Sequence, residues 1–124
     1  MAALLVALGG ALGSLLRFGV NVWCAQLGPA WPFATSIVNV LGSFGLAFIS
    51  RAWPDRTYLG VPLMLTIGTG VFGGFTTYSA FNLEVLLLFQ RGDSARAVAY
   101  AAVTVLGCVA AGLFGFWCAA RVAM

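Results

Sequence analysis

Four long apolar runs, separated by short polar or glycine- and proline-containing segments, make up almost the whole chain. A helix needs about 20 apolar residues to cross the hydrocarbon core of a bilayer, and each run has about that length or more. The pattern therefore predicts an all-α membrane protein with four transmembrane helices in a single domain, residues 1–124. The expected spans are about 2–24, 33–51, 58–90 and 95–120.

The third run is too long for one straight span. As a continuous helix, residues 58–90 would extend about 50 Å, at about 1.5 Å per residue, against a hydrocarbon core of about 30 Å. Its middle, GTGVFGGFTTYSAF at residues 68–81, contains four glycines. Each glycine weakens helix formation by roughly 1 kcal/mol relative to alanine. We therefore expect the third helix to be broken near 70–79, with the glycines as the cause.

Composition supports a membrane location. Hydrophobic residues make up 62% of the chain and charged residues 7%, which a water-soluble domain cannot carry without large exposed apolar patches. We expect a multi-pass integral membrane protein, and the family resemblance given below implies the inner (plasma) membrane of the cell. The net charge of +3 is too small and too scattered to indicate a nucleic-acid partner. No histidine, one glutamate and two aspartates leave little acid–base chemistry, so we do not expect an enzyme.

Arginines are divided almost evenly between the two expected ends of the bundle. Arg51, Arg56 and Arg121 fall at one end; Arg91 and Arg96 fall at the other, which has two arginines, or three if Arg17 is counted there. The excess of arginine that normally orients a membrane protein is therefore missing. This balance predicts insertion in both orientations and an antiparallel, dual-topology homodimer. A single topology fixed by another subunit is the alternative.

Polar side chains within the expected spans are the candidate functional residues, because a polar group in hydrocarbon costs several kcal/mol unless it is paired or hydrated. Two sets follow the four-residue spacing of one helix face: Thr35, Asn39 and Ser43, and Tyr100, Thr104 and Cys108. The carboxamide of Asn39 has two donors and an acceptor, and we expect it in a pore or at a helix interface. The second set predicts a weakly polar track on the fourth helix.

Two charged residues also lie within the spans. Arg17 falls about two thirds of the way along the first span, where it can extend to the interface or make a vestibule electropositive. Glu84 follows the expected break and can pair with an arginine or face water. Without a histidine or a second acid nearby, it is a poor candidate for proton relay.

A broken helix at membrane depth is typical of a backbone that lines a cavity or binds an ion. The N–H groups of half-helices attract anions, and freed carbonyls coordinate cations. Phe72, Phe75, Tyr78 and Phe81 surround the expected break. The edge of an aromatic ring is electropositive, so rings seen edge-on in a dry pore can support a small anion. Packing of these rings against neighbouring helices is the other interpretation.

Three motifs resemble, in the right order, the first-helix, second-helix and broken-helix motifs of the Fluc (CrcB) fluoride channels of microbes. They are GGALGSLLRF at 9–18, WPFATSIVNVLGSFGLA at 31–47 and GVFGGFTTYSAFNLE at 70–84. The resemblance covers essentially the whole chain. It implies a dual-topology dimer with two antiparallel pores at its interface, which passively exports cytoplasmic fluoride and so relieves its toxicity. The chain departs from the family pattern at Tyr78, usually phenylalanine, at Ala80, usually threonine, and at Cys108, where a serine would extend the track.

The resemblance also implies the site residues. The fluoride pore would be lined by Asn39, Tyr78 and Phe81, with Ser79 and Thr77 nearby and Tyr100 and Thr104 as the polar track. Arg17 would line the vestibule. A structural Na⁺ at the centre of the dimer would be held by the backbone carbonyls of Gly73 and Thr76 from both subunits.

Two other functional classes stay open. A small dual-topology, proton-coupled multidrug exporter has a similar length and number of spans, but relies on an acidic residue in its first helix, and this chain has none there. A non-transporting membrane subunit would be favoured if the polar stripes packed only within the chain.

Overall fold

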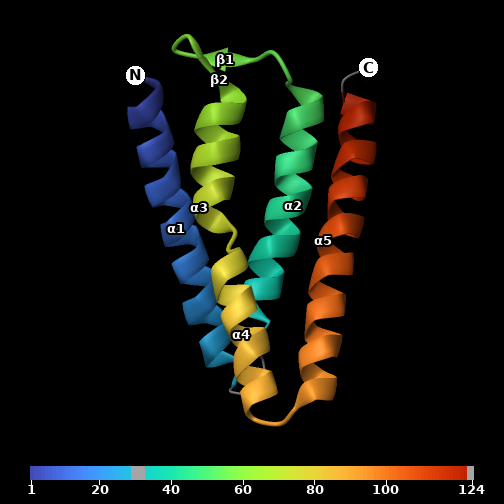
Figure 1. Cartoon of the computed structure of the whole chain (residues 1–124). Helices are drawn as coiled ribbons and strands as arrows, with labels where there is room; N and C mark the ends of the chain where they lie inside the picture. Colours follow the sequence, from blue (N-terminus) through green and yellow to red (C-terminus); the bar gives the residue numbers. More distant parts are fainter. Residues whose placement is uncertain (29–32, 123–124) are drawn as a thin grey trace.

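The computed structural model describes residues 1–28 and 33–122, whose helices form an elongated bundle with both ends of the chain at the same end (Figure 1). The helices and strands in chain order are α1 (Ala2–Gln26), α2 (Ala34–Ala52), β1 (Thr57–Tyr58), β2 (Val61–Pro62), the π-helix η1 (Met64–Phe72), α3 (Gly73–Phe75), α4 (Tyr78–Gln90) and α5 (Ser94–Val122). Four helical stretches are long and apolar enough to cross a membrane: Ala2–Gln26, Ala34–Ala52, Met64–Gln90 and Ser94–Val122. The predicted all-α membrane fold with four spans is confirmed.

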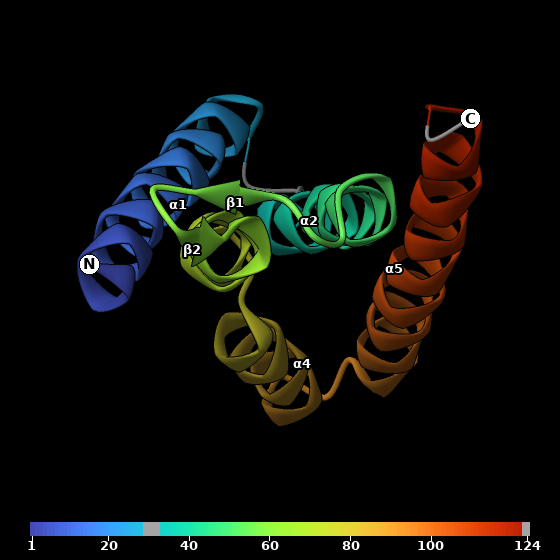
Figure 2. The same ribbon diagram turned by 90° about the horizontal axis from the view of Figure 1, so that it is seen from above.

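The third helical region begins at Met64 rather than at residue 58. Strands β1 and β2 pair antiparallel, with Tyr58 opposite Val61, and so leave a two-residue turn at Leu59 and Gly60. Both turn residues have positive φ, 50° and 74°, which matches the twist of a tight hairpin. The hairpin lies across the end of the bundle that also holds the two termini (Figures 1 and 2).

Small residues make the contacts of α1 with η1 and α3. Gly9 and Gly13 are buried, whereas Leu12 and Leu15 on the same helix are 51% and 67% exposed. A β-carbon at Gly13 would overlap the carbonyl oxygen of Val71. Large apolar side chains outside and glycines inside are expected for helices in lipid, because close backbone packing rather than removal from water holds them together.

The most extensive helix contact is between α2 and α5. Buried Gly115 of α5 lies against the carbonyl oxygen of Phe44 in α2, 2.5 Å from where a β-carbon would be. The rings of Phe44 and Phe114 add a tilted contact with centroids 5.8 Å apart. Figure 2 shows α2 and the third helical region between α1 and α5. This arrangement places the broken segment beside α2, the helix that carries Asn39.

The third helix is broken at Thr76 and Thr77, within the predicted range (Figure 1). Both residues have extended backbone, with φ/ψ of −82°/160° and −153°/116°. The predicted cause is wrong, however: Gly70, Gly73 and Gly74 all lie in helical segments. Gly70 and Gly74 instead permit close contact with α1, since a β-carbon on either would press on its backbone. The hydroxyl of Thr77 accepts from Ala80 N at 3.2 Å and caps the start of α4.

Candidate functional site

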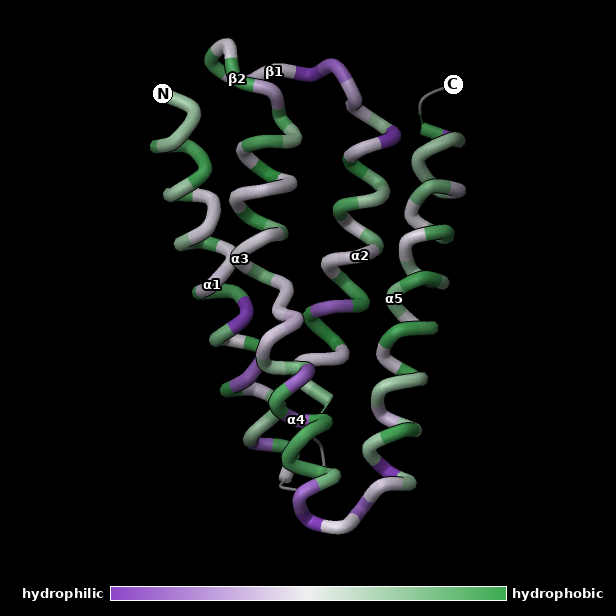
Figure 3. Tube along the Cα trace, in the orientation of Figure 1, coloured by the Kyte–Doolittle hydropathy of each residue, from purple (hydrophilic) through white to green (hydrophobic). Residues whose placement is uncertain are grey.

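An open cavity of about 360 Å³ lies between α2, the helix break and α5. Its lining includes six of the predicted pore and metal-site residues, namely Asn39, Thr76, Thr77, Tyr78, Phe81 and Thr104, together with Cys108 of the expected polar track. We call this cavity the groove. Figure 3 shows hydrophilic positions interrupting the otherwise apolar α2 and the start of α4. The fold thus gathers polar residues that lie far apart in sequence.

Asn39 binds the broken backbone directly. Its side-chain oxygen Oδ1 accepts from Thr77 N at 2.8 Å, and its Nδ2 donates to Thr77 O at 3.0 Å. The carboxamide therefore serves both main-chain groups of Thr77, as a neighbouring strand would, and stabilises the extended conformation. The second N–H of Asn39 has no acceptor among the described residues, and it is the group of Asn39 that remains to contact an ion.

The break also frees carbonyl groups. In a continuous helix Thr77 N would donate to Gly73 O, but here it donates to Asn39 Oδ1. Within the part of the chain that the structure describes, the carbonyls of Gly73 and Thr76 have no hydrogen-bond donor. Gly73 is exposed, and Thr76 is half-buried and lines the groove.

A hydroxyl and carboxylate network connects α2, α4 and α5. Glu84 accepts from the Thr35 hydroxyl at 2.6 Å and from the Tyr100 hydroxyl. The hydroxyls of Ser36 and Thr104 share a 2.6 Å hydrogen bond. From the sequence, we expected Glu84 to pair with an arginine or to face water. Among the described residues, its partners are the two hydroxyls instead. Thr35 was a candidate from its place on the polar stripe of α2, but its partner Glu84 was not predicted. Ser36 lies outside that stripe and was missed.

Three aromatic rings follow one another from the groove into the bundle. Tyr78 and Phe81 have centroids 5.9 Å apart at 58°, and Phe81 and Tyr100 have centroids 5.6 Å apart at 47°. Phe81 and Tyr100 are buried, whereas Tyr78 is 78% exposed. Tilted rings of this kind present electropositive edges to their surroundings. Tyr100 therefore reaches the site through Phe81 and Glu84, and not as a lining residue of the groove.

Besides Tyr100 and Gly73, the predicted residues Ser79 and Arg17 do not line the groove. Ser79 is exposed, and its hydroxyl lies 3.3 Å from that of Thr77. Arg17 is half-buried on α1 and does not line the groove. Within the described chain, the groove itself has no charged lining residue. Amide, hydroxyl and ring-edge groups can contact a small anion there without holding it as strongly as a full positive charge would.

The family model described as "CrcB-like protein, Camphor Resistance (CrcB)" matches residues 4–116. A protein of Anaeromyxobacter dehalogenans is 50% identical over 87% of this chain and 86% of its own. Proteins of Methylobacterium sp. (47% identical; 90% and 87% covered) and Sorangium cellulosum (42% identical; 94% and 92% covered) are also similar. Each of the three is named "Fluoride-specific ion channel FluC".

Proposed function

Because the chain belongs to the CrcB-like family, we propose that it is a fluoride-specific ion channel, the activity for which its relatives are named. It is a multi-pass protein of the bacterial plasma membrane and an ion channel rather than an enzyme. The exporter alternative is not supported, since the relatives are channels and α1 carries no acidic residue.

The observation that carries this proposal is the neutral groove at the helix break. Asn39, Thr104, Tyr78 and Phe81 line this open cavity, and they provide amide, hydroxyl and ring-edge groups. A small anion that sheds water needs donors at short range. Because the groove contains no full positive charge, the anion can also leave it, which conduction requires.

Export needs no coupled energy source. Fluoride that enters as HF loses its proton at neutral cytoplasmic pH and is trapped as the anion. A negative-inside membrane potential drives an anion outward with about 2.3 kcal/mol per charge per 100 mV. The absence of a proton-relay pair in the predicted pathway is consistent with such a passive leak.

A second, antiparallel copy of the chain would complete the pore. Tyr78, Ser79 and Asn82 are exposed at the membrane-spanning break and the start of α4, where contact with lipid would leave their polar groups unpaired. A partner surface would cover these groups and provide the other wall of the groove. The even division of arginines between the two ends supports insertion in both orientations.

Structural Na⁺ would be held by Gly73 and Thr76 of both copies. Neutral carbonyl oxygens suit a hard cation, and the carbonyls of both residues lack donors among the described residues. Such an ion would bring the two broken helices together at the centre of the dimer.

Fluoride efflux from liposomes tests the function. Purified protein is reconstituted in KF-loaded vesicles, valinomycin is added so that K⁺ balances charge, and released fluoride is followed with a fluoride electrode. Rapid efflux supports the channel. Proton-coupled cation uptake would support the exporter, and no flux of either kind a non-transporting subunit.

Orientation and sodium are tested separately. Thr57, exposed on the hairpin, is changed to cysteine in a chain whose native cysteines are replaced by alanine. An impermeant maleimide should label about half of this protein in intact cells, because two topologies are equally populated in an antiparallel dimer. Labelling of all or none contradicts dual topology. Equal melting temperatures of the solubilised protein with and without Na⁺ would contradict the sodium site and leave fluoride conduction unaffected.

A further inference from the structure

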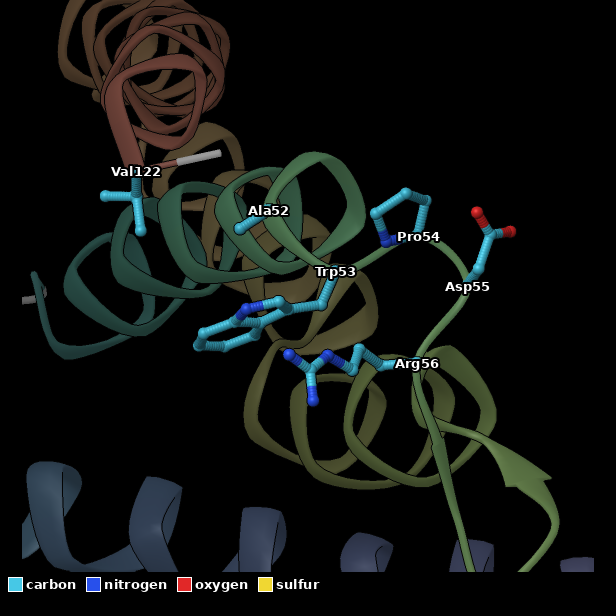
Figure 4. A pocket seen from close by; sticks show the side chains of 6 residues that line it. All are labelled: Ala52, Trp53, Pro54, Asp55, Arg56 and Val122. Carbon is cyan, nitrogen blue, oxygen red and sulfur yellow. The ribbon is translucent and has the colours of Figure 1, made fainter. Parts of the chain in front are cut away.

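Two open cavities flank Arg56 at the end of the bundle that holds the termini and the hairpin. One, of about 430 Å³, is lined by the segment 52–56 and by Val122 of α5. The other, of about 330 Å³, is lined by Trp53, Arg56 and Leu63. Figure 4 shows the guanidinium of Arg56 beneath the indole of Trp53, while the carboxylate of Asp55 points away.

The position of Arg56 is fixed by its backbone. Its N–H donates to Trp53 O at 3.4 Å, and its carbonyl accepts from Leu63 N at 2.8 Å. Its guanidinium forms no ion pair within the described residues, and the indole N–H of Trp53 has no acceptor there. Because α2 ends at Ala52, both donors lie where a spanning helix leaves the hydrocarbon, at the depth of lipid headgroups.

This end of the bundle is positively charged. Arg51 lies in the last turn of α2, and the guanidinium of Arg121 lies 3.9 Å from the centre of the Trp117 ring. Asp55 is the one acidic residue at this end in the described chain. Basic residues with tryptophans at the level of the headgroups favour anionic lipids.

The hairpin tip adds an apolar contact surface. Leu59 has a φ of 50°, a left-handed conformation that asparagine or glycine adopts far more readily than leucine. Its side chain is nevertheless 63% exposed, and that of neighbouring Tyr58 is 56% exposed. An exposed leucine at such a position is suited to contact with an apolar phase, and the boundary between headgroups and acyl chains provides one.

We propose that this corner binds an anionic phospholipid. The phosphate accepts hydrogen bonds from the Arg56 guanidinium and the Trp53 indole N–H, and the hairpin tip, Tyr58 and Leu59, contacts the upper acyl chains. A free phosphate ion would use the same two donors, but it leaves the exposed tip unexplained. The site is remote from the groove and independent of fluoride conduction.

Thermal unfolding of the full chain in a nonionic detergent tests the proposal. Added phosphatidylglycerol should raise the melting temperature of the wild-type protein by several degrees, while phosphatidylcholine and inorganic phosphate should not. Arg56→Gln should lose most of this increase, with an unchanged melting temperature in phosphatidylcholine. Arg91→Gln, at the opposite end of the bundle, is the matched control and should keep the increase. If Arg56→Gln fails to fold, Trp53→Phe, which keeps the ring and removes the N–H, should lose part of the increase.

Two results would overturn the proposal. Equal increases in the wild-type protein and Arg56→Gln would exclude this arginine as the headgroup ligand, and an increase with inorganic phosphate alone would indicate a soluble-anion site. The tip is tested by a fluorophore on Leu59→Cys in a chain without native cysteines. Its emission should shift to the blue on reconstitution into phosphatidylglycerol vesicles, and emission typical of water would contradict lipid contact.

Discussion

Replacing Asn39 by aspartate should keep one of the two hydrogen bonds that stabilise the helix break and remove the other. The two side chains have nearly the same shape. Aspartate keeps an oxygen for Thr77 N, at 2.8 Å in the wild-type protein, but places a second oxygen 3.0 Å from the carbonyl of Thr77, where a donor is needed. Leaving a partly buried carbonyl without its donor costs about 1–3 kcal/mol, so Asn39→Asp should lower the free energy of unfolding by about that amount.

The effect on fluoride flux should be larger. A carboxylate in the groove repels a passing anion by roughly 3 kcal/mol, if the two charges come within about 5 Å at an effective dielectric constant near 20. Since about 1.4 kcal/mol corresponds to a factor of ten in rate, we expect efflux to fall about 100-fold or more. Fluoride efflux from liposomes and thermal melting in detergent measure the two effects independently.

A control on the same helix distinguishes an effect at the groove from a general effect on α2. Ser50→Ala removes a side-chain hydrogen bond to a backbone carbonyl, from Ser50 Oγ to Ala47 O at 2.8 Å, but lies outside the groove. Its efflux should match that of the wild-type protein. Wild-type efflux by Asn39→Asp, with an unchanged melting temperature, would refute the role assigned to the Asn39–Thr77 pair.

Three further predictions use paired variants. Phe81→Ile should abolish efflux and leave a folded protein, because it removes the buried ring between two tyrosines. Phe89→Ile, at an exposed position, should conduct normally. Conduction by both variants would argue against a ring in the pathway. Gly13→Ala should destabilise the protein by about 1–3 kcal/mol through overlap with the facing carbonyl, whereas Gly19→Ala, with open space around it, should melt like the wild-type protein. A small thiol reagent should slow efflux of the wild-type protein by modifying Cys108 in the groove. Cys108→Ala should conduct fluoride and be insensitive to the reagent. Equal inhibition of both proteins would place the reactive thiol elsewhere.

The location of the helix break was predictable, but its cause was not. Chain length against bilayer thickness required an interruption near the middle of the third run. Glycine propensities identified the right stretch for the wrong reason, because the glycines there remain helical and two of them, Gly70 and Gly74, contact α1. The extended conformation of Thr77 depends on Asn39, 38 residues earlier in the chain, and local propensity contains no such tertiary contact.

The hydroxyl network is a second feature that depends on tertiary contacts and could not be predicted from the sequence. Helical spacing placed Thr104 and Tyr100 on one face of α5, and Thr35 on the polar face of α2. Spacing alone does not give the rotation of one helix relative to another, which decides that Glu84 faces two hydroxyls. The hairpin was missed although Gly60 and Pro62 are turn and helix-breaking signals, because the apolar run around them resembled a span.

The rings of Tyr78, Phe81 and Tyr100, the aromatic ladder, are unequally exposed in a single chain. Phe81 is 8% exposed and packed between two rings, whereas Tyr78, next in the ladder, is 78% exposed. A dry pathway in which ring edges contact an anion needs protein on both sides of Tyr78, because lipid there offers the phenolic hydroxyl no partner. In the proposed dimer, the partner would supply that second wall, and the Tyr78 hydroxyl would donate to the partner or to the ion. Tyr78→Phe distinguishes these two roles, since loss of dimer stability with unchanged efflux indicates the first and reduced efflux from a stable dimer indicates the second.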